Sequence, residues 1–187
     1  MRIIAGEFRS RKILPPASDA TRPITDRVKQ SLFDILNPHI ENARVYDCFA
    51  GTGSMGLECL SRGAAHATFF EADRSAAALL RKNIAALNVR DRSAVVDTDL
   101  FKWFDRPPPP ASERRISLIF LDPPYRFLRE RTEDLRRVAS RLKEHLSDEG
   151  IIVFRHDTND SLTLPSLTAF DHREYGGMTI QLLRRCS

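Results

Sequence analysis

From Arg44 onward, short apolar runs alternate with amphipathic stretches, and this alternation limits the possible folds more than any other feature of the sequence. Short runs rich in Val, Ile, Leu and Phe are typical of buried strands, and apolar residues at every third or fourth position are typical of helices. Strands that alternate with helices imply βαβ units, and therefore an α/β fold with a mostly parallel sheet covered on both faces. The predicted strands are residues 45–49, 67–71, 93–97, 116–121 and 150–154, with one or two more between 175 and 183.

Three amphipathic stretches in this part of the chain are predicted helices. Asp73 is placed to cap the second, because an aspartate side chain can accept from the free N–H groups of a first helical turn. The third is predicted to end near Gly150, and the four prolines at 107–110 form a stiff connector that fits neither a helix nor a central strand. The apolar positions of the three helices are Leu57 and Leu60; Ala76, Ala77, Leu80, Ile84 and Leu87; and Leu128, Leu135, Val138, Leu142 and Leu146.

The composition is typical of a globular protein with one domain of ordinary size. Of 187 residues, 42% are hydrophobic and 29% are charged, and no apolar run approaches the roughly 20 residues that span a bilayer. Residues 1–7 lack the apolar core of a signal peptide, so we expect a cytoplasmic protein. The three cysteines and five histidines show no metal-ligand spacing. We therefore expect no metal and no membrane partner, and the simplest expectation is a monomer.

The first 36 residues differ from the rest of the chain in charge. They contain seven Lys and Arg residues against four Asp and Glu residues, and so carry +3 of the net charge of +4, which suggests a polyanionic partner. Strand-like residues at 2–14 predict a hairpin, and Thr25 is placed to cap a following helix. The apolar face of that helix is formed by Val28, Leu32, Ile35 and Leu36. We predict a small basic extension, residues 1–36, docked on an α/β domain, residues 37–187.

A glycine-rich segment, residues 51–56, follows the first predicted strand with the pattern G-x-G-x-x-G. Its glycines allow a sharp turn and a close approach to a ligand. Glu71, at the end of the next strand, is placed to accept hydrogen bonds from ribose hydroxyls. The segment therefore predicts a site for a nucleoside-containing cofactor, and it leaves open whether this is a dinucleotide or S-adenosylmethionine. A merely tight strand-to-helix turn is the alternative interpretation.

Acidic residues inside the end of the first strand and after the third favour S-adenosylmethionine. Asp47 puts a carboxylate beside the cofactor, where it suits an ammonium or sulfonium group and would repel a pyrophosphate. Asp99 is predicted to accept from the adenine amino group, whereas Asp97 is open to interpretation as a helix N-cap. The predicted cofactor-binding residues are Asp47, Phe49, Ala50, Gly51, Gly53, Glu71 and Asp99.

The segment Asp122-Pro123-Pro124-Tyr125 directly follows the fourth predicted strand and determines the predicted chemistry. The lone pair of an aromatic amine is delocalised into its ring, so the nitrogen attacks poorly until acceptors hold its hydrogens and orient it. The Asp122 carboxylate and the Pro123 carbonyl can be these acceptors and can stabilise the developing positive charge. The prolines fix the shape of the loop, and Tyr125 offers a ring for stacking of an extruded base. We predict that all four residues are catalytic and that they serve methylation of a nucleobase amine.

Over nearly its full length, the chain resembles the RsmD-type 16S ribosomal RNA guanine-N2 methyltransferases. Asp122–Tyr125 is shared by many amino-methyltransferases, and the specific part of the resemblance is the arginine-rich N-terminal segment. The residues that carry the resemblance are 2–6, Arg9, Arg11, Lys12, 22–28, Leu32, Phe33, 47–53, 56–58, 61–64, Glu71, Asp73 and 122–125.

This resemblance implies a Rossmann-like class I methyltransferase with a seven-stranded sheet and S-adenosylmethionine as cofactor. It implies methylation of one guanine N2 of 16S rRNA, presented on an assembled or nearly assembled 30S subunit. Clustered basic residues then favour contact with RNA phosphates, although ordinary surface charge stays open for each one, and Arg22 and Arg27 could instead pair with Asp26. The RNA-binding candidates are Arg2, Arg9, Arg11, Lys12, Arg22 and Arg27.

The chain departs from the family pattern at three places. Arg155 stands where many relatives have an acid after the fifth strand, the turn at 176–177 is one residue longer, and the proline loop at 107–110 is peculiar to this chain. We predict that none of these departures touches the cofactor or the catalytic loop, and that Arg155 alters local RNA contacts.

Three other functions stay open. Asp122–Tyr125 also permits an adenine or cytosine amine in DNA or RNA as the target, but a DNA enzyme usually carries a target-recognition domain, for which this chain has no room. A nicotinamide-dependent oxidoreductase could use residues 51–56, but this function leaves Asp122–Tyr125 unexplained. The intact Asp122 argues against a non-catalytic RNA-binding assembly factor.

Overall fold

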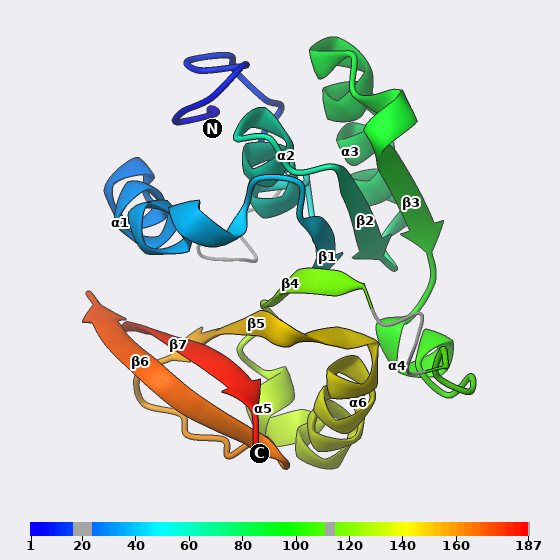
Figure 1. The fold of residues 1–187 in the computed structure, drawn as a ribbon, viewed down its shortest axis with the longest axis vertical. Helices are drawn as coiled ribbons and strands as arrows, with labels where there is room; N and C mark the ends of the chain where they lie inside the picture. Colours follow the sequence, from blue (N-terminus) through cyan, green and yellow to red (C-terminus); the bar gives the residue numbers. More distant parts are fainter. Residues whose placement is uncertain (17–23, 111–114, 187) are drawn as a thin grey trace.

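The computed structural model describes residues 1–16, 24–110 and 115–186, and its centre is a seven-stranded sheet (Figure 1). The strands are β1 Arg44–Cys48, β2 His66–Glu71, β3 Ser93–Asp97, β4 Ile116–Leu121, β5 Leu146–Asp157, β6 Leu167–Tyr175 and β7 Met178–Arg185. Their order is β3-β2-β1-β4-β5-β7-β6, with β1 to β5 parallel and β7 antiparallel to both β5 and β6. The predicted α/β fold with a mostly parallel sheet is confirmed. Because the strand order reverses between β1 and β4, a ligand site is expected at their carboxyl ends.

Helices cover both faces of the sheet (Figure 1). They are α1 Asp26–Leu36, α2 Ser54–Ser61, α3 Arg74–Leu87, α4 Leu100–Trp103, α5 Phe127–Glu130 and α6 Thr132–His145, with short 3-10 turns at Asn37–His39 and Arg90–Arg92. Alternate strand residues point to opposite faces. Val45 and Leu118 therefore pack in the cluster that contains α1, α2 and α3, and Cys48 and Ile119 in the cluster that contains α4, α5 and α6. No helix in the described ranges is long and apolar enough to cross a bilayer.

Two predicted helix caps are confirmed. The Thr25 side chain accepts from the Val28 N–H at the start of α1, and the Asp73 side chain accepts from the Ala76 N–H at 2.8 Å at the start of α3. Each bond satisfies one of the N–H groups that a first helical turn leaves without a partner. The buried face of α1 also contains Lys29, a position that the apolar pattern did not indicate.

The prediction of a single helix that ends near Gly150 is wrong in two respects. Arg131, at φ −134° and ψ 37°, separates α5 from α6, and α6 ends at His145. Leu146 is instead the first residue of β5, where it is fully buried and pairs with Ile116 of β4. A Cβ on Gly150 would lie 2.5 Å from the Leu146 side chain, so the glycine allows a close packing inside the strand instead of ending a helix.

The N-terminal segment forms a compact loop, where a hairpin of two strands was predicted. A single antiparallel bridge joins Arg2 and Lys12, because the chain between them turns to pack against the end of α2. Gly6 makes this contact possible: its φ is +82°, and a Cβ there would lie 1.9 Å from the Ser61 carbonyl oxygen. Ile3 is fully buried in the same cluster as the strand residues of this face, so the loop and the sheet share one hydrophobic core.

Candidate active site

A cavity of about 240 Å³ opens at the carboxyl ends of β1 and β4, where the strand order reverses. One wall comes from the end of β1 and the glycine-rich loop, with Asp47, Phe49, Ala50 and Gly51. Another part of the lining comes from the loop after β4 and from β5, with Asp122–Tyr125 and Arg155. The N-terminal segment contributes Met1, Pro16 and Ile24. The two segments that the sequence assigned to cofactor and to catalysis thus face one cavity.

The glycine-rich loop leaves β1 through a run of left-handed residues. Phe49, Gly51 and Gly53 have φ values of +62°, +56° and +85°. A Cβ on Gly51 would meet no atom within 4 Å, whereas a Cβ on Gly53 would lie 2.4 Å from Leu80 and one on Gly56 would lie 2.3 Å from Phe69. Gly51 therefore leaves space for a ligand, while Gly53 and Gly56 allow α2 to pack closely against α3 and the sheet.

Asp47 is a buried carboxyl group in the wall of the cavity. It is 2% exposed, and its Oδ2 accepts from the Gly56 N–H at 2.9 Å. Burial, and to a smaller extent the nearby Asp122 and Glu71, raise the pKa of Asp47 to about 8, against the Gly56 hydrogen bond and Lys29, which lower it. A cationic ligand favours the ionised form of such a group. The site therefore fits the ammonium or sulfonium of S-adenosylmethionine.

We expect Asp47→Asn to flatten the pH dependence of the free energy of unfolding. The folded protein keeps a proton on Asp47 that the unfolded chain releases above about pH 4, so stability falls as pH rises from there through the folded pKa of about 8. The slope is at most about 1.4 kcal/mol per pH unit, and asparagine does not titrate. Urea unfolding at about pH 5 and about pH 8 measures the difference. Asp148→Asn, at a 98% exposed side chain, is the control, and equal slopes in both variants would contradict the assignment.

Glu71 and Asp99 lie at the ends of β2 and β3 and do not line the cavity. The Glu71 carboxylate accepts from the Gly51 N–H at 2.7 Å and from the Asp73 N–H at 2.8 Å, and so shapes the glycine-rich loop. Asp99 caps α4 by accepting from the Phe101 N–H at 3.0 Å. Asp97, which was open to interpretation as the N-cap, instead pairs with Arg81. Cofactor contact by Glu71 and Asp99 stays a prediction.

The loop Asp122–Tyr125, which the sequence predicts to be catalytic, is tied to a side chain that the sequence did not connect with it. Arg155 Nε donates to Asp122 Oδ1 at 2.7 Å, and Arg155 Nη2 lies 2.6 Å from Asp122 Oδ2. The prediction that Arg155 stays clear of the catalytic loop is therefore wrong, because the β4–β5 pairing brings the two residues together. Of the two proline carbonyls, that of Pro124 accepts from the Phe127 N–H at 2.8 Å and holds the start of α5.

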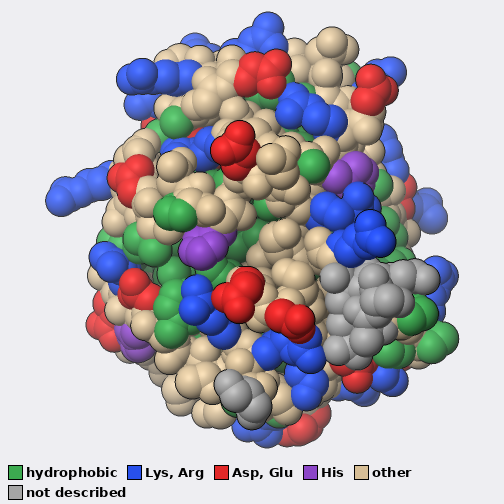
Figure 2. Space-filling view, in the orientation of Figure 1, with side chains coloured by type: hydrophobic (Ala, Val, Ile, Leu, Met, Phe, Trp, Pro, Cys, Tyr) green, Lys and Arg blue, Asp and Glu red, His purple; other side chains and the backbone are tan. Residues whose placement is uncertain are grey.

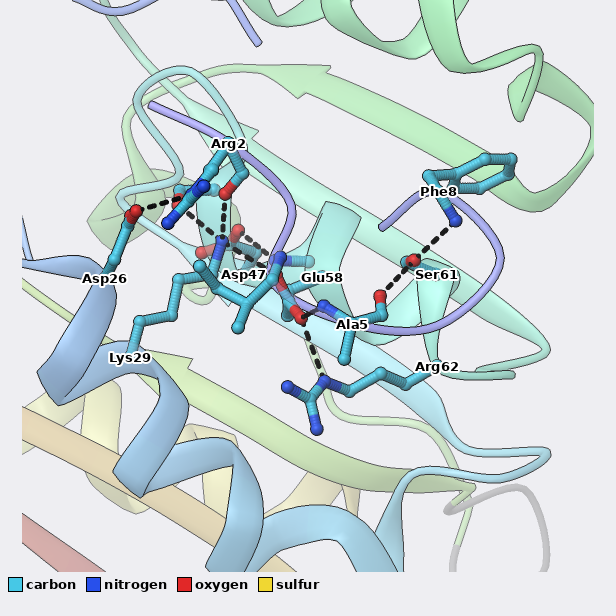
Figure 3. Close-up of polar contacts among 12 residues, drawn as sticks. Arg2, Ala5, Phe8, Asp26, Lys29, Asp47, Glu58, Ser61 and Arg62 are labelled. Carbon is cyan, nitrogen blue, oxygen red and sulfur yellow. Dashed lines mark hydrogen bonds and ion pairs between the residues drawn. The ribbon is translucent and has the colours of Figure 1, made fainter. Parts of the chain in front are cut away.

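A buried ion pair behind the glycine-rich loop connects the N-terminal segment to the cavity (Figure 3). Lys29 Nζ lies 3.0 Å from Glu58 Oε2 and 3.1 Å from Ser54 Oγ, and Ser54 lines the cavity. Glu58 also accepts from the Ile4 and Ala5 N–H groups at 2.8 and 3.0 Å. Burial lowers the pKa of Lys29, against the attraction of Glu58. The pair therefore joins α1, α2 and the N-terminal loop at one point.

The predicted RNA-binding residues that the structure describes are exposed, but they have different partners. Arg9, Lys12 and Arg27 are exposed. Arg2 pairs with Asp26 at 2.7 Å, and Arg11 donates to the Ala86 carbonyl at 3.4 Å. Arg22 lies outside the described residues. Figure 2 shows basic side chains around much of the outline of this view, interspersed with acidic ones, rather than one continuous basic patch.

Comparison with known proteins identifies the family. The family model described as "Conserved hypothetical protein 95" matches residues 1–184. Ribosomal RNA small subunit methyltransferase D of Escherichia coli is 38% identical over 178 residues, which cover 93% of this chain and 83% of that protein. The putative rRNA methyltransferase YlbH of Bacillus subtilis is 32% identical, with 94% of each chain covered. The solved structure of the putative methyltransferase yhhF from Escherichia coli superposes with a TM-score of 0.84 at 34% identity, and the match covers 100% of this chain and 98% of that one.

The sheet order and the site define a class I methyltransferase, a class that uses S-adenosylmethionine as methyl donor. Within this class, the chain belongs to the RsmD family, the family of ribosomal RNA small subunit methyltransferase D.

Proposed function

We propose that this chain transfers a methyl group from S-adenosylmethionine to the exocyclic N2 of one guanine in 16S rRNA of the 30S ribosomal subunit. The observation that supports this most is that the Asp122 carboxylate lines the same cavity as Asp47 and Gly51. The relatives from Escherichia coli and Bacillus subtilis are named as rRNA methyltransferases, which supports ribosomal RNA as the substrate. The choice of guanine N2 and of the 30S subunit rests on the sequence resemblance described above.

The residues around the cavity provide what amine methylation requires. The Asp122 carboxylate and the Pro123 carbonyl accept the two amine hydrogens and orient the nitrogen lone pair. When bound, the cofactor supplies a methyl group on a sulfonium sulfur that leaves as a neutral thioether while the nitrogen lone pair forms the new N–C bond. The alkylated nitrogen then releases one proton to water without a dedicated base. Asp122 stabilises the positive charge that the nitrogen carries before it loses that proton.

Other residues have supporting roles in this proposal. Tyr125 stacks on the extruded base, which is worth about 1–3 kcal/mol. Glu71 and Asp99 accept from the ribose hydroxyls and the adenine amino group of the cofactor. The chain acts as a monomer in which residues 1–36 contact RNA and residues 37–187 carry out the reaction.

The experiment that tests this function uses labelled S-adenosylmethionine with 30S subunits, free 16S rRNA and duplex DNA, followed by mass spectrometry of the nucleosides. We expect N2-methylguanosine from 30S subunits. Label in adenine or cytosine amines would point to the alternative amino-methyltransferases. Label in DNA, or no label in any substrate, would overturn the proposal.

We expect Arg9→Ala with Lys12→Ala to weaken 30S binding without changing cofactor affinity. Each phosphate contact releases about one counterion, so the slope of log affinity against log salt should become shallower by about 1.5 to 2 units for two contacts. The matched control is Lys102→Ala with Arg106→Ala, which removes an exposed lysine in α4 and an exposed arginine shortly after it, on the opposite face of the sheet. If both pairs shift the slope equally, the N-terminal residues are ordinary surface charge.

A further inference from the structure

Arg155 holds the Asp122 carboxylate with a two-pronged contact at the edge of the cavity. The two contacts measure 2.7 and 2.6 Å, and the side chains are 12% and 23% exposed. The strand register explains the contact. β4 and β5 are parallel neighbours in which Leu121 pairs with Phe154, so the residues that follow each of them come side by side. A planar guanidinium that donates to both carboxylate oxygens fixes the orientation of the carboxylate plane as well as its position.

Asp122 is half-buried, and three titratable groups lie around it. Arg155 pairs with it, Asp47 on β1 is a like charge when both carboxyl groups are ionised, and Tyr125 on the same loop lies close to the Asp122–Arg155 pair. Glu71 raises the pKa of Asp47, and Lys29 lowers it. A carboxylate removed from water is costly unless a cation and hydrogen bonds compensate it. Arg155 is that cation: burial lowers the pKa of Arg155, but attraction to Asp122 raises it above its ordinary value.

The contact with Arg155 still leaves Asp122 able to accept an amine. Each carboxylate oxygen has two lone-pair positions, and a two-pronged arginine contact uses one on each oxygen. Asp122 also lines the cavity, so the remaining positions are within reach of a ligand there. A protonated Asp122 would instead offer an O–H donor to an amine that presents its own N–H donors.

We propose that Arg155 is a positioning residue for methyl transfer, which fixes the plane and the ionised state of the Asp122 carboxylate so that Asp122 can accept the amine hydrogens. This inference rests on the proposed function. It assigns to Arg155 an effect on the reaction that passes entirely through Asp122. A purely structural arginine would support folding alone and would leave the pH profile of transfer unchanged.

The test compares Arg155→Gln, which removes the charge, with Arg155→Lys, which keeps the charge but loses the planar fork. For Arg155→Gln we expect kcat/KM at neutral pH to fall by about 10- to 100-fold, with recovery as pH rises because Asp122 must now ionise without its cation. For Arg155→Lys we expect a lower kcat with the pH profile of the unmodified protein. The Kd for S-adenosylmethionine should stay unchanged in both variants.

A second readout does not depend on transfer. The 13C NMR signal of the Asp122 carboxyl carbon, assigned by its loss in Asp122→Asn, should titrate at higher pH in Arg155→Gln than in the unmodified protein. Arg185→Gln removes a half-buried arginine that pairs with the exposed Asp148 at 3.1 Å, and it should change neither readout. Unchanged Asp122 titration in Arg155→Gln, or a pH profile parallel to that of the unmodified protein, would overturn the proposal. Absence of transfer by the unmodified protein would instead overturn the proposed function, while the NMR titration still decides the role of Arg155.

Discussion

Replacing Asp122 with Ala is expected to abolish methyl transfer while S-adenosylmethionine still binds. In the proposed reaction, the substitution removes an acceptor that orients the amine and stabilises its developing charge. Loss of one such preorganised group lowers kcat by about 100- to 1,000-fold. The glycine-rich loop and Asp47 also line the cavity, and the Gly56–Asp47 hydrogen bond does not involve Asp122 and is kept. Single-turnover transfer to 30S subunits measures the loss, and calorimetric titration with S-adenosylmethionine measures the retained binding.

Asp122→Ala also leaves the charge of Arg155 without its carboxylate, so stability has to be measured beside activity. Asp122→Asn with Arg155→Gln removes both charges of the pair, and it should still be inactive while unfolding closer to the unmodified protein. Asp148→Asn, at the exposed carboxylate that pairs with Arg185, is the control and should keep full activity. A loss of cofactor affinity as large as the loss of transfer would mean that Asp122 binds cofactor and does not orient the amine.

The positions of the main elements could be predicted because each depends on local pattern. The apolar runs at 67–71, 93–97 and 116–121 coincide with β2, β3 and β4 to within one residue. The end of an apolar run also placed Asp122–Tyr125, since the carboxyl ends of parallel strands share one edge of the sheet. The beginning of β5 could not be found in this way. Leu146 fits the helical period, and only its pairing with Ile116 makes it a strand residue.

The charged contacts of the site were missed because they depend on which strands and helices become neighbours. No pattern in the residues around Arg155 predicts its contact with Asp122. That contact follows from the β4–β5 pairing, which places Arg155 beside Asp122. Lys29 is a basic residue on a helix in the basic N-terminal segment, where exposure is the ordinary expectation. Glu58 did carry a signal. It stands among Gly56, Leu57, Cys59 and Leu60, and a charge inside a short buried helix needs a partner.

Glu58→Gln is expected to lower the free energy of unfolding by about 3–5 kcal/mol. The Glu58 side chain is fully buried and binds two cations, Lys29 at 3.0 Å and Arg62 at 2.9 Å, whose side chains are 2% and 7% exposed. Glutamine keeps the shape but removes the charge, so both cations stay buried without compensation. It also turns an amide N–H₂ toward groups that are themselves donors, among them the Ile4 and Ala5 N–H groups.

The pH dependence of this loss identifies its cause. Burial already lowers the pKa of Lys29, and without Glu58 the pKa falls further. In the Glu58→Gln variant, Lys29 then binds a proton in the unfolded chain that it releases in the folded protein. The loss in free energy of unfolding is therefore largest at low pH and shrinks as pH rises. Urea unfolding at about pH 6 and about pH 9 measures it. Glu7→Gln, on the same loop, breaks an exposed pair with Arg92 and should change the free energy of unfolding by about 1 kcal/mol or less. If Glu58→Gln loses no more than Glu7→Gln, the buried pair does not hold the N-terminal loop on α2.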